Sequence, residues 1–332
     1  MSVLSTQHLT IGYRKKGTEN VIQHDLNLRL ESGKLVGLIG PNGSGKTTLL
    51  RTIAGLLKPI DGKILIDDKH LLLLSQHEKA LNVSFVLTEK VDIANADVFD
   101  MVSFGRFPYN NWRGNLSEGD RKKVFQALQM VRMETMMHRL VSELSDGERQ
   151  RVMIAKALAQ DTPIILLDEP TAHLDVPNRV GIMLLLHKLA HTTGKIILLS
   201  THELDLALQA ADLIWLMSEN EGIECGVPED LVFSGSFNRV FASNSYFFNE
   251  ANGNFSLNYP LNGKVSVSGN KTRLYWTLRA LARAGYAAVE DAPLKIEVTD
   301  SAWILNQKKV FSVAELLDEL NSLNNLNSRF PF

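Results

Sequence analysis

Short apolar runs alternate with polar, glycine-containing segments along the first 250 residues of the chain. Three of these runs, at residues 35–39, 164–167 and 196–199, have the length and composition of strands buried on both faces of a parallel sheet. Residues 3–13 and 21–30 instead alternate in the manner of half-exposed strands joined by a basic turn. The pattern predicts an α/β domain that is preceded by a β-hairpin.

Helical spacing replaces this pattern in the middle of the chain. Residues from about 96 to 160 are predicted to be mainly helical, most clearly over 118–140, where Val124, Leu128 and Val131 recur on one face. We therefore expect one large domain over residues 1–255 that contains a helical subdomain at about 96–160.

The C-terminal part has shorter elements and forms a separate predicted module over residues 260–325. A capping box at Ser312 and Glu315 precedes its last helix. We expect a small α+β module in the order β-α-β-β-α, which serves either as a packing or dimer-stabilising appendage or as a regulatory module. Its predicted elements before the last helix are strand 264–268, helix 272–284, and strands 294–299 and 302–306.

A glycine-rich segment follows the first buried strand and precedes a helical pattern. It fits the spacing G-x-x-x-x-G-K-[ST] of a phosphate-binding loop, in which glycines allow backbone N–H groups to converge on an anion at a helix start. Lys46 would reach the β- and γ-phosphates and the Thr47 hydroxyl would bind Mg²⁺. A glycine turn without a ligand is the alternative, and the Lys-Thr pair disfavours it. The predicted nucleotide-binding residues are Gly40, Pro41, Asn42, Gly43, Ser44, Gly45, Lys46, Thr47 and Thr48.

Two carboxylates end the second buried strand. Asp168 and Glu169 stand at the carboxyl end, where ligands bind in open α/β sheets. Asp168 would hold Mg²⁺ directly or through water, and Glu169 would accept a proton from the attacking water. One such carboxylate could simply cap the next turn, but a pair after a buried strand favours catalysis.

The segment 144–150 reads Leu-Ser-Asp-Gly-Glu-Arg-Gln, in which Ser145 and Glu148 have the spacing of a helix-capping box. It also resembles the LSGGQ signature of the ATP-binding cassette (ABC) ATPases. The resemblance covers about residues 2–250, with every major motif in order. It implies a P-loop NTPase fold with a RecA-like core, an antiparallel β subdomain and a helical subdomain. It also implies that Ser145 and Gly147, with Glu148 beside them, contact ATP across a homodimer interface.

Further residues take their roles from the same resemblance. Asp175, which ends the segment Ala-His-Leu-Asp, matches the D-loop that shapes the opposite ATP site. His202 follows the third buried strand and matches the switch histidine that contacts the γ-phosphate. Tyr13 resembles the aromatic residue that stacks on adenine. Without the resemblance, a helix cap, a structural histidine and a core tyrosine would be the default interpretations.

Two positions depart from the family pattern. Thr88 stands where a glutamine normally ligates Mg²⁺, and the neighbouring Glu89 is the other candidate for that role. We expect Thr88 to keep the coupling position with a weaker metal contact. Asp146 replaces the usual glycine of the signature, and aspartate tolerates positive φ better than most residues.

Residues 98–109 narrow the functional expectation. They resemble the matching stretch of ATPases that serve importers of ferric siderophores, heme and cobalamin, with Arg106 and the aromatic–proline turn after it expected near the permease contact. The resemblance implies an ATP- and Mg²⁺-dependent homodimer that works with transmembrane permease subunits and, indirectly, a solute-binding protein. An exporter subunit and a soluble ABC protein are the alternatives, and a single cassette without sustained heptads disfavours the soluble class.

Composition sets limits on these expectations. The chain has 332 residues and a net charge of −2, so it has no basic excess that would favour nucleic acid. A single cysteine excludes a disulfide framework within the chain. No signal peptide and no segment of about 20 apolar residues is recognisable, so we expect a peripheral protein on the cytoplasmic face of the membrane.

Overall fold

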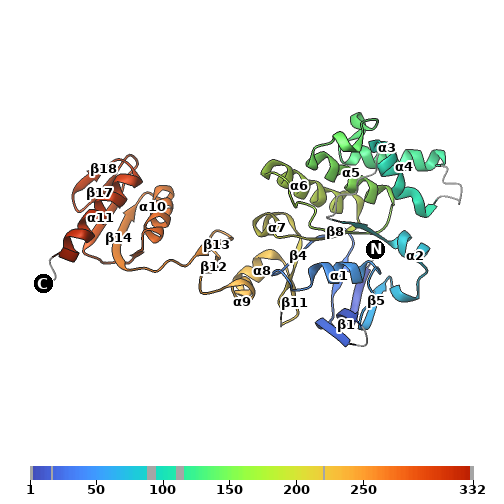
Figure 1. Cartoon of the computed structure of the whole chain (residues 1–332), viewed down its shortest axis with the longest axis horizontal. Coiled ribbons are helices and arrows are strands. Elements are labelled where there is room, and N and C mark those ends of the chain that lie inside the picture. The colour runs from blue at the N-terminus through green and yellow to red at the C-terminus, as the bar shows by residue number, and fades with distance from the viewer. Residues whose placement is uncertain (1–2, 16–17, 88–94, 110–115, 220, 330–332) are drawn as a thin grey trace. The chain divides into compact units, whose positions relative to one another are not determined.

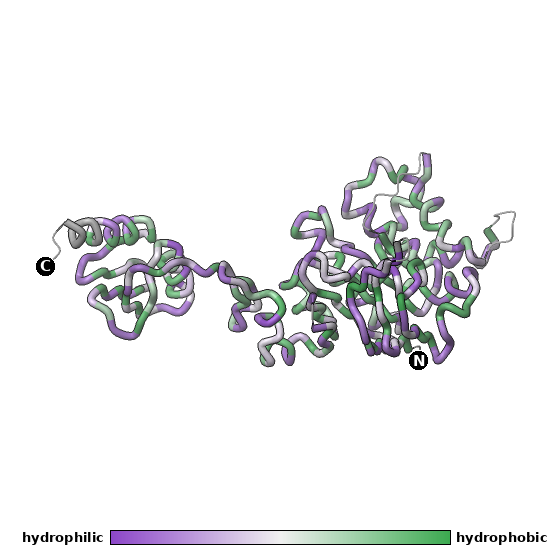
Figure 2. The backbone as a smooth tube through the Cα atoms, turned by 60° about the horizontal axis from the view of Figure 1, so that its bottom comes forward, coloured by the Kyte–Doolittle hydropathy of each residue, from purple (hydrophilic) through white to green (hydrophobic). Residues whose placement is uncertain are grey.

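The computed structural model describes residues 3–15, 18–87, 95–109, 116–219 and 221–329 (Figure 1). The chain divides into two compact units. The first comprises Met1–Ala242 and Phe248–Phe255, and the second comprises Ser243–Phe247 and Ser256–Phe332. Each unit has hydrophobic segments of its own (Figure 2) and its own core clusters. No helix among the described residues combines the length and the hydropathy needed to cross a bilayer.

A six-stranded sheet forms the centre of the first unit, in the order β11-β10-β4-β9-β8-β7. Neighbouring strands are parallel except for the antiparallel β10–β11 pair. Every residue of β4, β8 and β9 is buried, as the three apolar runs predict. The strands are β4 (Leu35–Ile39), β7 (Val83–Val86), β8 (Ile164–Asp168), β9 (Ile196–Ser200), β10 (Leu213–Met217) and β11 (Ile223–Gly226).

An antiparallel sheet, in the order β2-β1-β5-β6 with β3 paired to β1, shares a core with the central sheet. Leu9 and Ile11 of β1 pack in this core together with Leu49 and Leu50 of the helix α1 (Lys46–Ile53). β1 pairs antiparallel with β2, which confirms the predicted hairpin, although its second strand, predicted over 21–30, is divided into β2 and β3. The strands are β1 (Val3–Lys15), β2 (Thr18–Leu26), β3 (Arg29–Glu31), β5 (Asp61–Ile66) and β6 (Lys69–His70).

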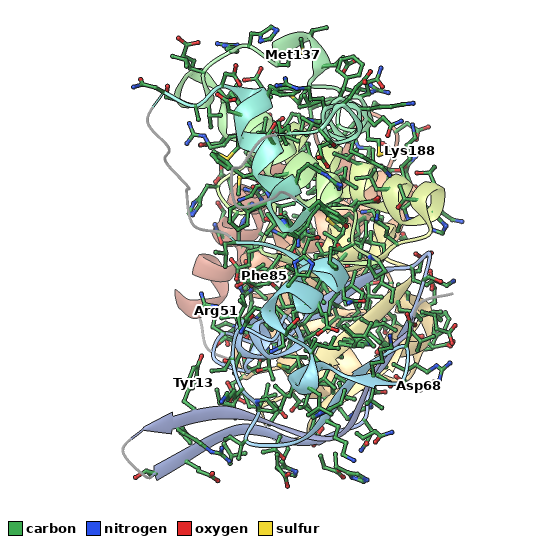
Figure 3. The ribbon with its side chains drawn as sticks, turned by 90° about the vertical axis from the view of Figure 1, so that its right-hand side faces the viewer. Tyr13, Arg51, Asp68, Phe85, Met137 and Lys188 are labelled. Atoms are coloured by element: carbon green, nitrogen blue, oxygen red, sulfur yellow. The ribbon has the colours of Figure 1, made fainter. Side chains whose placement is uncertain are left out.

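Helices form the other part of the first unit, and Figure 3 shows Met137 of this part at the opposite end of the view from Tyr13. The predicted helix over 118–140 is wrong in length, because α4 ends at Met130 and Arg132 has φ 61°. The helical elements up to the signature are η1 (Leu71–Leu73), α2 (Gln76–Asn82), α3 (Val98–Ser103), η2 (Phe104–Tyr109), α4 (Glu118–Met130), η3 (Glu134–Met136) and η4 (Val141–Glu143). After it come α5 (Asp146–Ala159), α6 (Val176–Thr193), α7 (Leu204–Ala210), α8 (Pro228–Phe233) and α9 (Ser236–Phe241).

A short hairpin of β12 (Tyr246–Asn249) and β13 (Asn254–Leu257) precedes the second core. The second unit then forms a five-stranded sheet in the order β15-β14-β16-β17-β18, with two helices. The predicted order β-α-β-β-α lacks β15 and β18, each of which has only three residues. The elements are β14 (Gly263–Gly269), α10 (Lys271–Arg283), β15 (Tyr286–Ala288), β16 (Leu294–Val298), β17 (Trp303–Leu305), β18 (Lys308–Val310) and α11 (Val313–Arg329).

Candidate nucleotide site

The glycine-rich loop connects β4 to α1, and its shape depends on two of its glycines. A Cβ on Gly40 would lie 2.4 Å from the backbone oxygen of Met217, so no larger residue fits beside β10. Gly45 has φ 108°, a conformation that L side chains rarely adopt, and it directly precedes Lys46 at the start of α1. The sequence therefore folds here into the strand–loop–helix arrangement of a phosphate-binding loop.

Lys46 is buried within this loop. Its Nζ donates hydrogen bonds to the backbone oxygens of Gly40 and Pro41, at 2.8 and 2.9 Å. Burial lowers the pKa of the Lys46 ammonium, and the charges of Glu169 and Asp168 act in the opposite direction. The two carboxylates therefore help to keep a positive charge in a buried position.

The ends of β8 and β9 bring the predicted catalytic residues together. The Thr47 hydroxyl donates to Asp168 Oδ1 at 3.1 Å, and the Ser200 hydroxyl donates to the same oxygen at 2.7 Å. Glu169 Oε1 lies 2.7 Å from His202 Nε2, and the backbone N–H of Glu169 donates to Ser200 Oγ at 3.0 Å. The P-loop, the paired carboxylates and the histidine thus form one hydrogen-bonded group.

Glu169 has an unusual backbone conformation. Its φ of 48° lies in the left-handed region, which is uncommon for residues other than glycine. Such conformations are retained at functional sites when the surroundings fix them. The Ser200 hydrogen bond to its N–H holds the chain in this turn and directs the carboxylate toward His202. Sequence reasoning missed Ser200, although its hydroxyl at the end of a buried strand was a usable signal.

The side chains at this site fit a magnesium–nucleotide complex. A hydroxyl and a carboxylate oxygen, from Thr47 and Asp168, already converge at 3.1 Å, and hard oxygen donors are the ligands that Mg²⁺ prefers. The buried hydroxyl oxygen of Ser44 in the loop makes no hydrogen bond within the described part of the chain. A phosphate oxygen would satisfy such a group, which is costly to leave unpaired.

Tyr13 lies beside the same helix. It projects from β1 (Figure 3), its side chain is 44% exposed, and its hydroxyl is 2.9 Å from Thr48 Oγ1. This hydrogen bond places an accessible aromatic ring next to the first turn of α1, where the adenine of a bound nucleotide could stack.

The signature residues form the start of α5. Ser145 and Glu148 make the predicted capping box, in which the Ser145 N–H and hydroxyl both donate to Glu148 Oε2. The hydrogen bond from the Ser145 backbone N–H, and then the one from the Ser145 hydroxyl, lower the pKa of the Glu148 carboxyl group. Gly147 is buried, and a Cβ there would lie 2.5 Å from Asn178 Oδ1. Asp146 is the first residue of α5, so it does not need the positive φ considered above.

Asp175, the predicted D-loop residue, caps α6. Arg179, which sequence reasoning missed, links the D-loop to the residue after His202. Asp175 Oδ1 accepts a hydrogen bond from the Asn178 N–H at 3.1 Å. Arg179 donates from Nε to the Leu174 backbone oxygen at 2.6 Å and from Nη1 to Glu203 Oε1 at 2.7 Å. Its guanidinium group thus ties the D-loop to the residue after His202.

Two further sequence predictions concern the permease contact and the position of the usual glutamine. Arg106 is buried, and its Nε donates to Asp120 Oδ1 at 2.9 Å while Nη1 donates to the Ala159 backbone oxygen. Arg106 therefore holds the helical subdomain together, while the aromatic–proline turn after it exposes Phe107 (77%) and Tyr109 (41%) and remains accessible to a partner. Thr88 and Glu89 lie outside the described residues.

Comparison with known proteins agrees with this geometry. Residues 23–172 match the family described as ABC transporter. The chain is 36% identical, over 79% of its length and 89% of the relative's, to an uncharacterized ABC transporter ATP-binding protein of Methanocaldococcus jannaschii. The chain belongs to the ABC transporter ATP-binding proteins. As an ABC ATPase, it binds and hydrolyses ATP.

Three further similarities concern the subgroup and the assembly of this ABC ATPase. It is 34% identical to the iron(3+)-hydroxamate import ATP-binding protein FhuC of Bacillus subtilis, over 73% of this chain and 88% of that protein. Residues 262–321 match the family described as iron ABC transporter C-terminal domain. A dimeric, post-hydrolysis cassette bound to ADP and Pi is 29% identical, with a TM-score of 0.58, over 68% of this chain and 98% of that one. ABC ATPases of this kind dimerise and act with permease components.

Proposed function

We propose that this ABC ATPase powers uptake through a transmembrane permease of an iron chelate (a ferric siderophore or heme) or of the related cobalt complex cobalamin. The observation that carries the proposal is the match of residues 262–321 to a C-terminal domain of iron ABC transporters, which accompanies the cassette. The likeness to an iron(3+)-hydroxamate import protein supports the same substrate class. The chain would be a peripheral subunit on the cytoplasmic face, and the chelate itself would contact the permease and a solute-binding protein.

In the proposed catalytic site, Glu169 accepts a proton from the attacking water while His202 orients its carboxylate through their 2.7 Å contact. Thr47 and Asp168 would hold Mg²⁺, which when bound neutralises negative charge on the phosphates. Lys46 exchanges its loop carbonyl partners for phosphate oxygens, and the loop N–H groups bind the remaining charge. Tyr13 stacks on the adenine.

The proposed site is complete only in a homodimer. Ser145, Gly147 and Glu148 of one chain would face the ATP that the P-loop of the other chain holds, and Asp175 would shape that opposite site. The helix α5 begins at this capping box, and the positive end of its dipole there suits a γ-phosphate. Closing and opening of the dimer would move the permease, in the manner of a ligand-driven switch between two states.

The test is uptake of radiolabelled ferric siderophore, heme and cobalamin by cells that lack this chain. The cells are complemented with the wild-type chain, with Glu169→Gln, or with Glu229→Gln, a control in the first turn of α8 outside the ATPase motifs. We expect one of the three uptakes to be lost without the chain and restored by the wild type and Glu229→Gln only. Normal uptake of all three substrates without the chain would contradict the proposal.

A further inference from the structure

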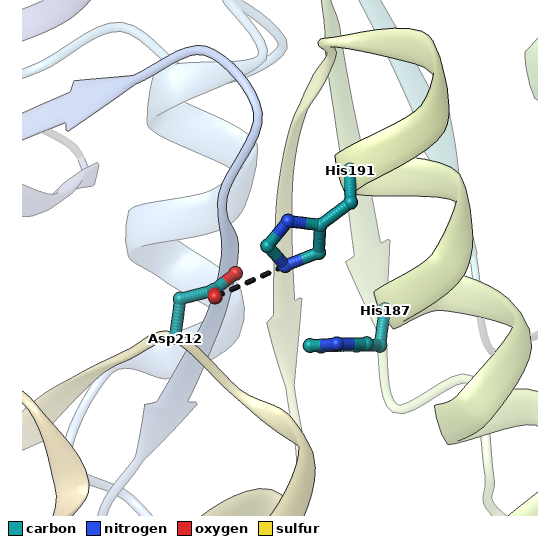
Figure 4. A group of neighbouring side chains, drawn as sticks. All are labelled: His187, His191 and Asp212. Atoms are coloured by element: carbon teal, nitrogen blue, oxygen red, sulfur yellow. Dashed lines mark hydrogen bonds and ion pairs between the residues drawn. The ribbon is translucent and has the colours of Figure 1, made fainter.

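Two histidines and an aspartate converge on the surface of the first unit, away from the residues that we assign to the nucleotide. His187 and His191 lie on α6, and Asp212 lies directly before β10 (Figure 4). One ligand atom from each of the three side chains can be chosen so that all three lie within 4.8 Å of one another. We propose that His187, His191 and Asp212 form a binding site for a divalent transition-metal ion.

The helix places the two imidazoles on the same side. Residues four apart in an α-helix are neighbours on one face, so His187 and His191 project in the same direction. Their ring centroids are 4.5 Å apart. Figure 4 shows both rings extending from α6 toward the segment that carries Asp212, which supplies the third ligand from a different element. Three donors from two elements converge without any rearrangement of the backbone.

The hydrogen bonds around the cluster orient two of its donors outward. His187 Nδ1 is 2.8 Å from the Ala210 backbone oxygen, which can only accept, so Nδ1 carries the proton and Nε2 keeps a free lone pair. Asp212 Oδ2 accepts a hydrogen bond from the Leu35 N–H at 2.7 Å, which holds the carboxylate and leaves Oδ1 for a ligand. Metal-binding histidines and carboxylates are typically fixed by such outer partners.

The ligand atoms of His191 and Asp212 have a spacing close to that of two ligands of one metal ion. His191 Nε2 is 3.1 Å from Asp212 Oδ1, to which its N–H donates a hydrogen bond (Figure 4). Two ligand atoms bound at about 2.0–2.2 Å to one tetrahedral ion are roughly 3.3–3.6 Å apart, so the pair would separate by a few tenths of an ångström. A metal ion can therefore replace that proton almost without movement of the pair, and a small rotation of His187 would add its Nε2.

The donor set selects the class of ion. Two imidazole nitrogens and one carboxylate oxygen suit Zn²⁺, Co²⁺, Ni²⁺ or Fe²⁺, whereas Mg²⁺ and Ca²⁺ prefer oxygen donors. The residues are distinct from Thr47 and Asp168, which we assign to the magnesium of the nucleotide. A bound ion would link α6 to the connection between α7 and β10. Through Asp212 it would also stabilise Leu35, the first residue of the strand that leads into the P-loop.

The test is equilibrium dialysis of the untagged, nucleotide-free full chain against Co²⁺, in a buffer with excess Mg²⁺. We expect one Co²⁺ per chain, displaced by Zn²⁺ and not by Mg²⁺. His187→Gln and His191→Ala should weaken this binding by about 10- to 100-fold or more. His8→Ala is the matched control, because His8 forms a His–Asp pair with Asp25 at 2.7 Å and is not part of the three-residue cluster. It should bind Co²⁺ as the wild type does.

The proposal would be overturned if no Co²⁺ bound at concentrations up to the millimolar range, or if His187→Gln and His191→Ala bound it like the wild type. Either result is expected if His191 and Asp212 form only an ordinary contact between α6 and the segment before β10. The His187→Gln side-chain amide can still donate to the Ala210 oxygen, so this variant tests ligation apart from the existing hydrogen bond. A second measurement, the Zn²⁺-dependent rise in Tm of the wild-type chain, needs no variant: a Tm that Zn²⁺ leaves unchanged would also contradict the site.

Discussion

Ser200 joins the carboxylate of Asp168 to the backbone of Glu169 in the nucleotide site. It is fully buried, donates to Asp168 Oδ1, and accepts from the N–H of Glu169, which stands in a left-handed conformation. The sequence was sufficient to place Asp168, Glu169 and His202 at neighbouring strand ends, because buried strands in a parallel sheet end at one edge. It was not sufficient to find the φ of Glu169 or the role of Ser200, which depend on contacts between strands far apart in the chain.

We predict that Ser200→Ala lowers kcat for ATP hydrolysis by roughly tenfold, with little change in KM. Removing the hydroxyl leaves the Glu169 N–H without its partner, at a cost of about 1–3 kcal/mol, and frees the carboxylate from its working position. Steady-state ATPase kinetics measure the split between kcat and KM. Ser301→Ala, at an exposed serine of the second unit, is the control and should match the wild type. An unchanged kcat in Ser200→Ala would refute the assigned positioning role.

The buried ion pair of Arg106 and Asp120 is expected to stabilise the helical subdomain. Both side chains are at most 10% exposed, and hydrogen bonds from Ser117 and then Arg106 lower the pKa of Asp120. Asp120→Asn should reduce the free energy of unfolding by about 3–5 kcal/mol at pH 7, because it leaves the Arg106 charge buried without a counter-charge. Chemical denaturation of both proteins measures this difference.

The same pair sets a pH dependence with a definite sign. The folded-state pKa of Asp120 lies below the unfolded value, so the stabilisation is fully present above the unfolded pKa and is lost as the pH falls through the folded one. The difference in unfolding free energy between the wild type and Asp120→Asn should therefore shrink in acid. A difference that stays constant down to about pH 2 would show that the Asp120 charge is not its source.

Among the helices and strands, the long periodic segments were predictable from the sequence. Two of the shortest strands and the point at which α4 ends were not. The buried strands β4, β8 and β9 follow from apolar composition alone. The helix predicted over 118–140 is too long because the apolar spacing continues past Met130, whereas the backbone turns at Arg132 with φ 61°. β15 (Tyr-Ala-Ala) and β18 (Lys-Lys-Val) have three residues each and lack the apolar run by which the equally short β17 (Trp-Ile-Leu) was predicted.

Arg179 connects the predicted D-loop before α6 to the segment after His202. We predict that Arg179→Ala lowers kcat several-fold with an unchanged ATP affinity. The loss of stability should stay within about 1 kcal/mol, because both side chains of the ion pair are one-third exposed. ATPase kinetics and Tm, measured on the same preparations, separate the two effects.

Arg179→Lys is the matched variant for this prediction. An ammonium group can reach one of the two partners but lacks the fork that bonds both, so its kcat should lie between those of the wild type and Arg179→Ala. If Arg179→Ala kept the wild-type kcat, or if its kcat fell only in step with a large loss of Tm, the link would have no role beyond structure.

For the whole molecule, the important feature is that each unit has a core of its own. Val265, Ile296, Leu305 and Leu316 belong to a cluster that contains only residues of the second unit. The β12–β13 hairpin contributes Phe248 to the core of the first unit, with Phe237 and Phe255 at centroid distances of 4.9 and 5.8 Å from it. A boundary after residue 258 keeps these aromatic contacts.

We predict that the chain truncated after Asn258 folds and keeps its ATPase rate within about twofold of the wild type. Calorimetry of the full chain should show two unfolding transitions, of which the truncated chain retains one, because separate cores unfold as separate cooperative units. A truncated chain that fails to fold would show that the units depend on each other. A large change in its ATPase rate, with folding preserved, would favour the regulatory interpretation of the C-terminal module.

The most direct test of the central claim, that Glu169 is the base of an ATP-hydrolysing site, is single-turnover hydrolysis by the purified chain. Wild type and Glu169→Gln are compared at saturating Mg·ATP, with nucleotide binding measured on the same samples. The account predicts that Glu169→Gln binds ATP within about threefold of the wild type and hydrolyses it about 10²- to 10⁴-fold more slowly. Hydrolysis by Glu169→Gln at a rate within tenfold of the wild type would contradict it.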